Sequence, residues 1–489
     1  MEVFHSDIVV IGGGGSGMAA AIEAAQHGAS VYLLEKNKKL GGSTAWSVGS
    51  VSASMSPHQK EEGILNDHPD DHFEDLGKFS GSMLDRDNLQ LRRVLVDNSP
   101  AMLQWLMDSG LVFYGPALEE PHRVPRMHNV VPSSKAFPFH LGRQCLKAGV
   151  NIKLSMSLDR FLTKEGRVIG VEAISEGHAK VQFHAKKAVI VASGDFSGGQ
   201  VLKKEYASEL AAAAGAVNVT NTGDGHRAAL AIGASIINGD LTHGPLIRFV
   251  PKAQPNWLEL IPPYSWIGHL ACWAMKNLPF KLIRPAVMSF LTTALGPDKG
   301  LYTQGAILVN KWGQRFSNEK DKPALDLVSQ PDRIGYIIMN AAIAKKFNQL
   351  PHFISTAPTV AYAFMDDYRK SRPDIYTEAS SIEELARRLK MQPEVLSAAV
   401  DSTSNNAIPL TGPGFVALGP VKSYVVMTEG GLAVNESHQV LGNDAKVISG
   451  LYAVGSAGQG GLLLPGHGHH LGWAFVSGRR AGKLAALSS

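Results

Sequence analysis

The fold of this chain depends on Asp7-Ile8-Val9-Val10-Ile11-Gly12-Gly13-Gly14-Gly15-Ser16-Gly17. The apolar run that opens this stretch predicts a buried parallel strand, and the small residues from Met18 onward predict a helix. The spacing Gly12-x-Gly14-x-x-Gly17 suits a tight turn whose backbone can approach a pyrophosphate and whose helix packs closely on the strand. A dinucleotide-binding unit is therefore expected at the start of the chain.

A second strand and a terminal acid complete this pattern. Val31-Tyr32-Leu33-Leu34 predicts the strand, and the Glu35 carboxylate that follows can accept hydrogen bonds from a ribose diol. An acid at this position favours FAD or NAD over NADP. The residues expected to contact the dinucleotide here are Gly12, Gly14, Gly15, Ser16, Gly17, Glu35 and Lys36.

Length and composition exclude several classes of protein. At 489 residues the chain is too long for one nucleotide-binding unit, and its net charge of +4 without Lys/Arg blocks gives no sign of a nucleic-acid partner. Cys145 and Cys272 stand alone, so neither a disulfide framework nor a thiolate zinc site is predicted. The start of the chain has no secretory signal pattern, and a cytoplasmic location is expected.

Further motifs resemble the fumarate reductase and 3-ketosteroid dehydrogenase group of flavoproteins. They are the Gly41-Gly42-Ser43-Thr44 loop, the strand 188–196, the Thr222-Gly223-Asp224-Gly225 turn, the 305–319 segment read as a β-hairpin, and Gly450-Leu451-Tyr452-Ala453-Val454-Gly455-Ser456. Relatives that attach FAD covalently carry a His in the first loop, where this chain has Ser43 and Thr44. The resemblance therefore implies non-covalent FAD. It adds Gly41, Gly42, Ser43, Thr44, Gly194, Asp224, Gly455 and Leu471 to the expected cofactor contacts.

The resemblance also implies the fold class and the domain order. We expect an α/β chain with a Rossmann-type FAD-binding domain, in which a parallel sheet carries helices and a small antiparallel unit. An α+β catalytic or capping domain is inserted into it. The expected boundaries are 1–238 and 419–489 for the FAD-binding domain and 239–418 for the insertion.

Three segments lead to local predictions. The polar stretch 55–75 contains His58, His68 and His72 at spacings that fit no standard zinc or calcium pattern, so it is expected to be solvated, and no metal site is predicted. The apolar periodicity of 87–111 predicts core helices, with Pro100 starting a second one. Residues 333–347 are also predicted to be helical.

The segment 249–297 is unusually apolar. Its uninterrupted apolar runs are shorter than the ~20 residues of a membrane span, so a transmembrane helix is rejected. Three interpretations stay open: a cap that encloses an apolar substrate, a basic-flanked surface that dips into a membrane interface, and an ordinary helical core. Trp257, Leu258, Trp266 and Trp273 are among the residues that raise the question.

The catalytic residues are less clearly indicated. Fumarate reductases use arginines after the hairpin and in the terminal loop, where this chain has Lys320-Asp321-Lys322 and His469-His470-Leu471. Ketosteroid dehydrogenases use tyrosines, where this chain has Pro323-Ala324 and Leu464-Pro465. Histidines titrate near neutrality and can replace either as acid or base. The candidates are His467, His469, His470, His243, Tyr264 and Tyr302.

The favoured prediction is an FAD-dependent oxidoreductase of the ketosteroid dehydrogenase-like branch. It would act on a C–C bond next to a carbonyl of an apolar, ketosteroid-like substrate, in steroid metabolism, by α,β-dehydrogenation or the reverse reduction. The alternatives are a reductase of a polar unsaturated acid and a membrane-surface flavin-binding protein without this catalysis. The partners expected are an apolar small molecule and an external electron donor or acceptor, with peripheral membrane contact through 249–297 as an open alternative.

Overall fold

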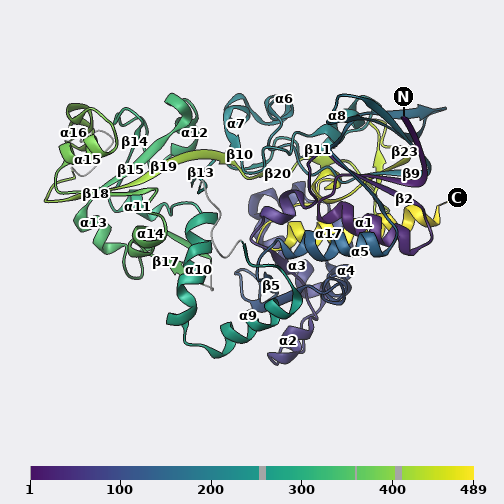
Figure 1. Cartoon of the computed structure of the whole chain (residues 1–489), viewed down its shortest axis with the longest axis horizontal. Helices are drawn as coiled ribbons and strands as arrows, with labels where there is room; N and C mark the ends of the chain where they lie inside the picture. The colour runs from purple at the N-terminus through teal and green to yellow at the C-terminus, as the bar shows by residue number, and fades with distance from the viewer. Residues whose placement is uncertain (1, 253–259, 358–360, 402–409, 489) are drawn as a thin grey trace.

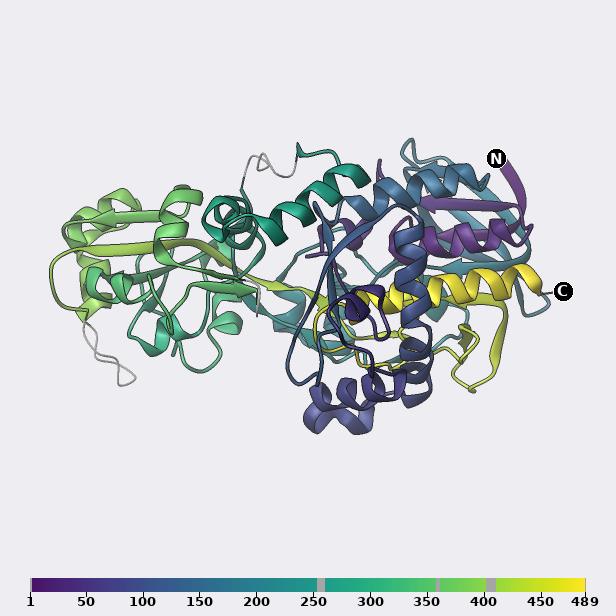
Figure 2. The same ribbon diagram turned by 90° about the horizontal axis from the view of Figure 1, so that it is seen from below.

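The computed structural model describes residues 2–252, 260–357, 361–401 and 410–488. Two lobes lie side by side along the longest axis, and both chain termini belong to the same lobe (Figures 1 and 2). The core of the first lobe draws its residues from Ile8 to Ala234 and from Leu432 to Ala486. The core of the second lobe lies between Phe249 and Val421.

The first lobe and its connections contain the following elements. The strands are β1 (Glu2–Ile11), β2 (Val31–Glu35), β3 (Ser50–Ser52), β4 (Val112–Ala117), β5 (Met127–Val131), β6 (Asn151–Leu154), β7 (Met156–Lys164), β8 (Arg167–Ser175), β9 (Lys180–Val191), β10 (Gly215–Ala216), β11 (Ile236–Ile237), β12 (Thr242–His243), β20 (Met427–Thr428), β21 (Gly431–Leu432), β22 (Gln439–Leu441) and β23 (Val447–Ala453). The helices are α1 (Gly15–Gln26), α2 (Pro57–Glu61), α3 (Pro69–Ser80), α4 (Leu89–Asp108), α5 (Ala136–Lys147), α6 (Gln200–Leu202), α7 (Glu209–Ala213), α8 (Asp224–Leu230) and α17 (His469–Leu487). Shorter helical turns are η1 (Gly42–Trp46), η2 (Gly81–Arg86), η3 (Lys203–Ala207) and η7 (Gly455–Gly458).

The second lobe combines a larger sheet and a two-stranded sheet with surrounding helices. Its strands are β13 (Leu246–Phe249), β14 (Ile307–Asn310), β15 (Gly335–Asn340), β16 (Ser355–Ala357), β17 (Ala361–Ala363), β18 (Tyr376–Ala379) and β19 (Phe415–Val425). Its helices are α9 (Ser265–Asn277), α10 (Phe280–Ala294), α11 (Gly300–Thr303), α12 (Pro323–Val328), α13 (Ala341–Lys346), α14 (Met365–Ser371), α15 (Ile382–Arg388), α16 (Pro393–Asp401) and the turn η5 (Pro331–Arg333). Strand β19 pairs with β13, β15 and β18 and reaches toward the first lobe (Figure 1).

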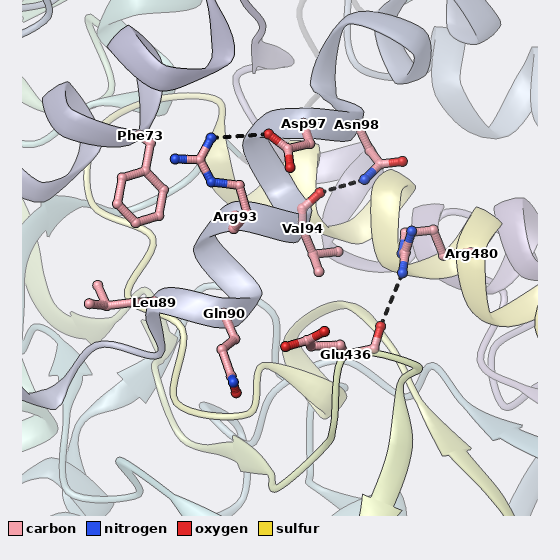
Figure 3. Close-up of a pocket in the computed structure, with 9 residues that line it drawn as sticks. All are labelled: Phe73, Leu89, Gln90, Arg93, Val94, Asp97, Asn98, Glu436 and Arg480. Carbon is pink, nitrogen blue, oxygen red and sulfur yellow. Dashed lines mark hydrogen bonds and ion pairs between the residues drawn. The ribbon is translucent and has the colours of Figure 1, made fainter.

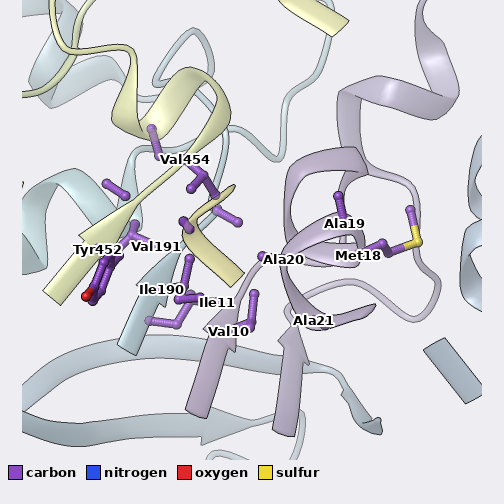
Figure 4. Close-up of a cluster of buried hydrophobic side chains, with 14 of the residues drawn as sticks. Val10, Ile11, Met18, Ala19, Ala20, Ala21, Ile190, Val191, Tyr452 and Val454 are labelled. Atoms are coloured by element: carbon purple, nitrogen blue, oxygen red, sulfur yellow. The ribbon is translucent and has the colours of Figure 1, made fainter. Parts of the chain in front are cut away.

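The main sheet of the first lobe has the strand order β22-β23-β9-β1-β2-β6. β1, β2, β6, β9 and β23 run parallel, while β22 joins β23 and β8 joins β9 in antiparallel fashion. Helices α1 and α17 pack against each other over this sheet, and the side chains of Val10, Ile11 and Ile190 lie together on neighbouring strands in its core (Figure 4). The α/β class and the Rossmann-type sheet predicted from the sequence are confirmed.

Glycines permit the close contact between β1, α1 and β9. Gly12 has φ of 106°, and a side chain there would overlap the backbone of Ala192. A side chain at Gly17 would overlap the carbonyl of Gly12. The turn therefore brings the start of α1 directly over the ends of two parallel strands, as the spacing of the three glycines predicts.

Two helix predictions were wrong. Pro100 lies inside the single helix α4, where the Ser99 hydroxyl donates a hydrogen bond to the Val96 carbonyl that the missing Pro100 N–H leaves free. Residues 335–340 form the central strand β15, and the helix α13 begins only at Ala341. Burial on both faces gives a central strand a continuous apolar run, which periodicity does not distinguish from a buried helix.

The predicted hairpin at 305–319 was only partly right. Its turn forms, with the Asn310 N–H donating to the Gln314 carbonyl, but the returning arm makes a single bridge between Val309 and Arg315. β14 instead pairs with β15. Glu319 then folds back, and its carboxylate accepts hydrogen bonds from the Leu308 N–H and from Arg315.

The prediction that 55–75 is a solvated segment was only partly right, because residues 60–63 and several others are exposed but part of the segment is buried. Asp67, His72 and Asp75 are at most 3% exposed, because the fully buried Arg126 pairs with both carboxylates at 2.5 Å and 2.7 Å. The chain here forms α2 and α3, which begin at prolines. An arginine about fifty residues further on supplies the charge that lets these acids enter the core.

The apolar segment 249–297 forms β13, α9 and α10. Trp257 and Leu258 lie outside the described residues. Within the described ranges, every helix is too short or too polar to cross a membrane.

Candidate active site

A backbone cradle lies where α1 begins. Gly14 precedes the helix and, as a glycine, supplies no side-chain cap, so among the described residues the first-turn N–H groups beyond Gly15 are available to an anion, while the Gly15 N–H donates to Thr44. A Cβ at Gly14 would have its nearest neighbour 4.0 Å away, at the Gly41 carbonyl, so this face is open. Gly41 and Gly14 form a parallel bridge, and a side chain at Gly42 would face the Gly14 backbone at 3.5 Å. The two predicted glycine loops therefore line one cradle.

Polar side chains fix the edges of this cradle. The Glu35 carboxylate is 5% exposed and accepts a hydrogen bond from the Gly13 N–H at 2.7 Å, which leaves lone pairs for a diol. The Thr44 hydroxyl accepts from the Gly15 N–H at 3.1 Å. Ser43 accepts from the amide of Asn221 at 2.9 Å.

The remaining predicted contacts gather at the same place or beside it. A side chain at Gly455 would meet the Ser16 hydroxyl, and one at Gly194 would meet the Asn221 amide. Leu471 lies on the first turn of α17, partly buried against the same core. These residues fit a dinucleotide: an open backbone surface at a helix start, an acid at the ribose position, and no side chain that would fill the space above Gly14 among the described residues.

Lys36 and Asp224, both predicted to contact the cofactor, bind each other in this structure. They form an ion pair at 2.8 Å, and Lys36 also donates to the Thr222 hydroxyl. Burial alone would raise the pKa of Asp224, but the hydrogen bond and charge of Lys36 lower it overall. The pair ties the end of β2 to the turn before α8. Contact of either side chain with FAD stays a prediction.

His470 pairs with Glu429, a residue that the sequence analysis did not single out. Their closest N–O distance is 3.2 Å, and both side chains are mostly buried. Burial alone would lower the pKa of His470, yet the charge and hydrogen bond of Glu429 raise it overall. The pKa of Glu429 is lowered in turn, because its interactions with His470 outweigh the opposing effect of burial. The described structure therefore holds a mostly buried histidine–glutamate pair, in which Glu429 favours the protonated form of His470 on the first turn of α17.

His467 forms a similar but more exposed histidine–glutamate pair, with Glu119. Its Nδ1 lies 2.5 Å from Glu119, its backbone N–H donates to the same carboxylate, and its side chain is 44% exposed. Its hydrogen bond to Glu119 raises the pKa of His467. Glu119 thus holds the loop before α17 in place from both the backbone and the side chain.

His469 points away from these two pairs into a buried group of three histidines. His72, His122 and His469 offer nitrogen atoms that all lie within 4.8 Å of one another. Burial lowers the pKa of all three, to about 4 for His122 and about 3 for His469. The sequence placed His469 among the catalytic candidates; the structure places it in the packed interior beside His72 and His122, and its catalytic role stays a prediction.

Hydrogen bonds define the tautomers of this group. Arg126 donates to His122 Nδ1 at 2.8 Å, so the neutral ring carries its proton on Nε2. His469 Nδ1 donates to the Pro465 carbonyl at 2.7 Å, which leaves Nε2 to accept from His72 Nε2 at 3.2 Å. A metal ion between the rings would meet a proton on His122 rather than a lone pair.

His243 lies near the His470–Glu429 pair. β12 pairs with β20, the Glu429 N–H donates to the Leu241 carbonyl at 2.9 Å, and the charges of Glu429 and His470 both act on His243. Burial is the largest influence on His243 and lowers its pKa, so its imidazole is neutral. The predicted candidates His243 and His470 are therefore brought together, although 227 residues separate them in the sequence.

Arg248, which the sequence analysis missed, also belongs to this neighbourhood. It lies on β13, where it pairs with Lys422 of β19, and its charge contributes to lowering the pKa of His243. Burial lowers the pKa of Arg248 itself. Within the described residues no carboxylate forms an ion pair with it, so its charge is available to a ligand.

The two tyrosine candidates lie elsewhere. Tyr264 precedes α9, is 43% exposed, and packs edge-on against Phe139. Tyr302 is 6% exposed in the core of the second lobe, and burial raises the pKa of its hydroxyl. Neither has a contact with the histidine pairs among the described residues.

A surface pocket of the first lobe is separate from this site. Figure 3 shows it between α4 and α17, lined by Phe73, Leu89, Gln90, Arg93, Val94, Asp97, Asn98, Glu436 and Arg480. Within it Arg93 bonds the Asp97 carboxylate, and Arg480 donates to the backbone carbonyl of Glu436. It contains none of the predicted catalytic residues.

The family of the chain follows from a match that covers most of its length. The model of the FAD binding domain family matches residues 7–256 and 287–463. The chain belongs to this family, and the cofactor it binds is FAD. This confirms the flavoprotein prediction and selects FAD from the dinucleotides that the first fingerprint left open.

Sequence relatives are distant and often longer. The chain is 24% identical to the NADH:fumarate oxidoreductase of Klebsiella pneumoniae over 92% of its own length, but it spans only 44% of that protein. It is 27% identical to the urocanate reductase of Eggerthella lenta, over 98% of this chain and 74% of the relative.

Solved structures agree on the fold. A flavocytochrome c3 fumarate reductase in an open conformation aligns with a TM-score of 0.73 at 22% identity, covering 99% of this chain and 78% of that one. The 3-ketosteroid Δ1-dehydrogenase of Sterolibacterium denitrificans aligns with a TM-score of 0.66 at 17% identity over 99% of both chains. The fold is that of flavoprotein oxidoreductases, with neighbours in both predicted branches.

Proposed function

We propose that the chain transfers hydrogen across a C–C bond next to a carbonyl group, with His470 exchanging the proton. FAD, when bound, supplies the hydride chemistry. The observation that carries the proposal is the buried His470–Glu429 pair, 3.2 Å apart, beside His243. The names of the sequence relatives, which are reductases of conjugated C=C bonds, support the same reaction class.

The electrostatics of the pair give His470 a defined role. Because Glu429 raises the pKa of His470, its imidazolium persists near neutral pH and can donate a proton to carbon during reduction of a C=C bond. In the reverse direction the neutral ring accepts that proton. Glu429 acts through His470 as a positioning residue.

Two further groups can stabilise the carbonyl oxygen of the substrate. The neutral imidazole of His243 can donate an N–H hydrogen bond, and the charge of Arg248 favours negative charge developing on that oxygen. Both lie on the chain segment that leads from the first lobe into the second.

An apolar ketone or enone, such as a ketosteroid, stays the first candidate substrate. It is supported by the structural likeness to ketosteroid dehydrogenases and by the absence of the two arginines that anchor dicarboxylates in fumarate reductases. The apolar residues of α9 and α10 add less support than the sequence suggested, because eight large apolar side chains between Leu260 and Leu282 are at least 37% exposed.

An unsaturated carboxylic acid is the second candidate, and Arg248 favours it. The two histidine–glutamate pairs are each neutral overall when the histidines are protonated, so the Arg248 guanidinium, which has no ion-pair partner within the described ranges, gives the site a positive charge. One carboxylate would balance that charge.

The test is anaerobic mixing of the chemically reduced, FAD-loaded protein with a panel of enones and unsaturated acids while the flavin absorbance is followed. We expect reoxidation by at least one class. Arg248→Gln should raise KM at least tenfold for an acid and leave the KM of a ketone unchanged. Failure of every compound to reoxidise the flavin, together with no bleaching of the oxidised protein by the saturated counterparts, would contradict the proposed reaction.

A further inference from the structure

The turn between α9 and α10 forms an exposed knuckle, which we define as residues 276–282. All seven residues are exposed, and three of them are large and apolar: Leu278 at 37%, Phe280 at 44% and Leu282 at 67%. Lys276 and Lys281 flank this apolar tip. Figure 1 shows α9 and α10 meeting at the lower edge of the molecule, and Figure 2 gives the same region from below.

An apolar stripe on α9 continues the tip of the knuckle. Trp266, Leu270 and Trp273 are 65%, 55% and 55% exposed and stand at positions i, i+4 and i+7. Residues at this spacing share one helix face. The opposite face of α9 is packed, because Gly268 lies against Val112 and Cys272 Sγ lies 3.4 Å from the Phe113 carbonyl.

The charged side chains of the segment itself are all basic, and an acid from α2 lies at its edge. Between residues 260 and 297 the sequence contains Lys276, Lys281 and Arg284 but neither Asp nor Glu. Arg284 is bound to Asp367 at 2.6 Å, whereas among the described residues Lys276 forms an ion pair only with Glu61, at 4.0 Å. Two lysine ammonium groups therefore stand beside an exposed apolar and tryptophan-rich surface.

This combination fits one partner. Tryptophan and tyrosine favour the boundary between lipid headgroups and acyl chains, lysines bind anionic headgroups, and a buried leucine or phenylalanine adds hydrophobic stabilisation. The helices have 13 and 15 residues, too short to span a bilayer but long enough to lie in its interface. We propose that the knuckle and the α9 stripe dock the protein on an anionic lipid surface.

The experiment is co-sedimentation of the FAD-loaded, full-length chain with vesicles of phosphatidylcholine alone and of phosphatidylcholine mixed with phosphatidylglycerol. We expect binding that is stronger to the anionic vesicles and falls as salt rises. Leu278→Ser/Phe280→Ser should reduce the bound-to-free ratio at least tenfold. Lys276→Glu/Lys281→Glu should reduce binding to the anionic vesicles selectively.

Leu350→Ser is the matched control, since Leu350 is also exposed, at 56%, but lies in the second lobe away from the knuckle. It should bind vesicles like the unaltered chain, and all variants should keep their flavin absorbance spectrum. Equal binding of the Leu278→Ser/Phe280→Ser variant and the control would contradict the proposal, as would a lack of binding to either vesicle. Conversion of a dimer into a monomer by that variant, without vesicle binding, would assign the surface to a second copy of the chain instead.

Discussion

His469 and His470 are consecutive residues on the first turn of α17, yet their imidazoles lie in opposite electrostatic surroundings. His469 faces two neutral histidines, and burial lowers its pKa to about 3. His470 faces Glu429, whose charge more than offsets burial and raises its pKa. The comparison shows that a neighbouring carboxylate, rather than depth of burial, decides the direction in which the pKa of a buried histidine shifts.

The largest expected effect is the loss of the proton donor. His470→Ala should slow flavin reoxidation by substrate about 10²–10⁴-fold, equivalent to roughly 2.7–5.4 kcal/mol of activation free energy, because general acid catalysis is lost. Stopped-flow absorbance measures this rate. His178→Ala, at an exposed turn, is the control. A rate within a few-fold of the unaltered protein would remove His470 from the proposed role.

The second prediction concerns the buried network behind His469. Arg126→Met should lower the free energy of unfolding by about 3–5 kcal/mol, because Asp67 and Asp75 would lose a fully buried partner. Arg123→Met is the comparison, since Arg123 also bonds Asp75 but is 37% exposed, and it should cost about 0–1 kcal/mol. Denaturant titration measures both. Equal losses of unfolding free energy in the two variants would show that the burial of Arg126 does not increase its contribution to stability.

A third, smaller effect is the pH dependence of stability. The folded pKa of His469 lies below the ordinary value of 6.5, so its contribution is complete above about pH 6.5 and is lost as the pH falls toward 3. His469→Gln does not titrate. The slope of unfolding free energy against pH between 6 and 4 should therefore be smaller in this variant, by up to about 1.4 kcal/mol per pH unit. Parallel curves for the two proteins would mean that the pKa of His469 is the same in the folded and unfolded states, and would contradict the prediction.

The smallest expected effect concerns His470 and the influence of Glu429 on its pKa. Glu429→Gln keeps a polar side chain but removes the charge that raises the pKa of His470. The imidazolium should therefore lose its proton at a lower pH, and the alkaline limb of the reduction rate should move to lower pH. Glu394→Gln, exposed in the second lobe, should leave the profile unchanged. An unmoved limb in the Glu429 variant would assign that limb to another group.

The first lobe was largely predictable because its signals are local. The Gly12–Gly17 turn, the strand before it and the acid at Glu35 occur within thirty residues, and each follows from backbone geometry or hydrogen-bonding capacity. Local patterns failed where burial is complete on all sides. β15 was read as a helix for this reason, and 55–75 was read as solvated because its neutralising Arg126 is distant in sequence.

The candidate site was harder to predict, because it depends on contacts between side chains that are distant in the sequence. The sequence pointed to His243, His467, His469 and His470 as titratable groups near an expected flavin, but treated the three terminal histidines alike. Their partners are Glu119, Glu429 and the His72–His122 group, which come from three separate segments. Arg248 became a candidate only when pairing of β13 with β19 showed its position.

The amino-acid sequence alone thus specifies the cofactor class, since the glycine loops and Glu35 act through the backbone and a short stretch of chain. Folding specifies which histidine carries charge. The pKa of an imidazole depends on desolvation and on charges a few ångströms away, and those neighbours are assembled from remote parts of the chain. For His470 that neighbour is Glu429, 3.2 Å away across the junction of β20 and α17.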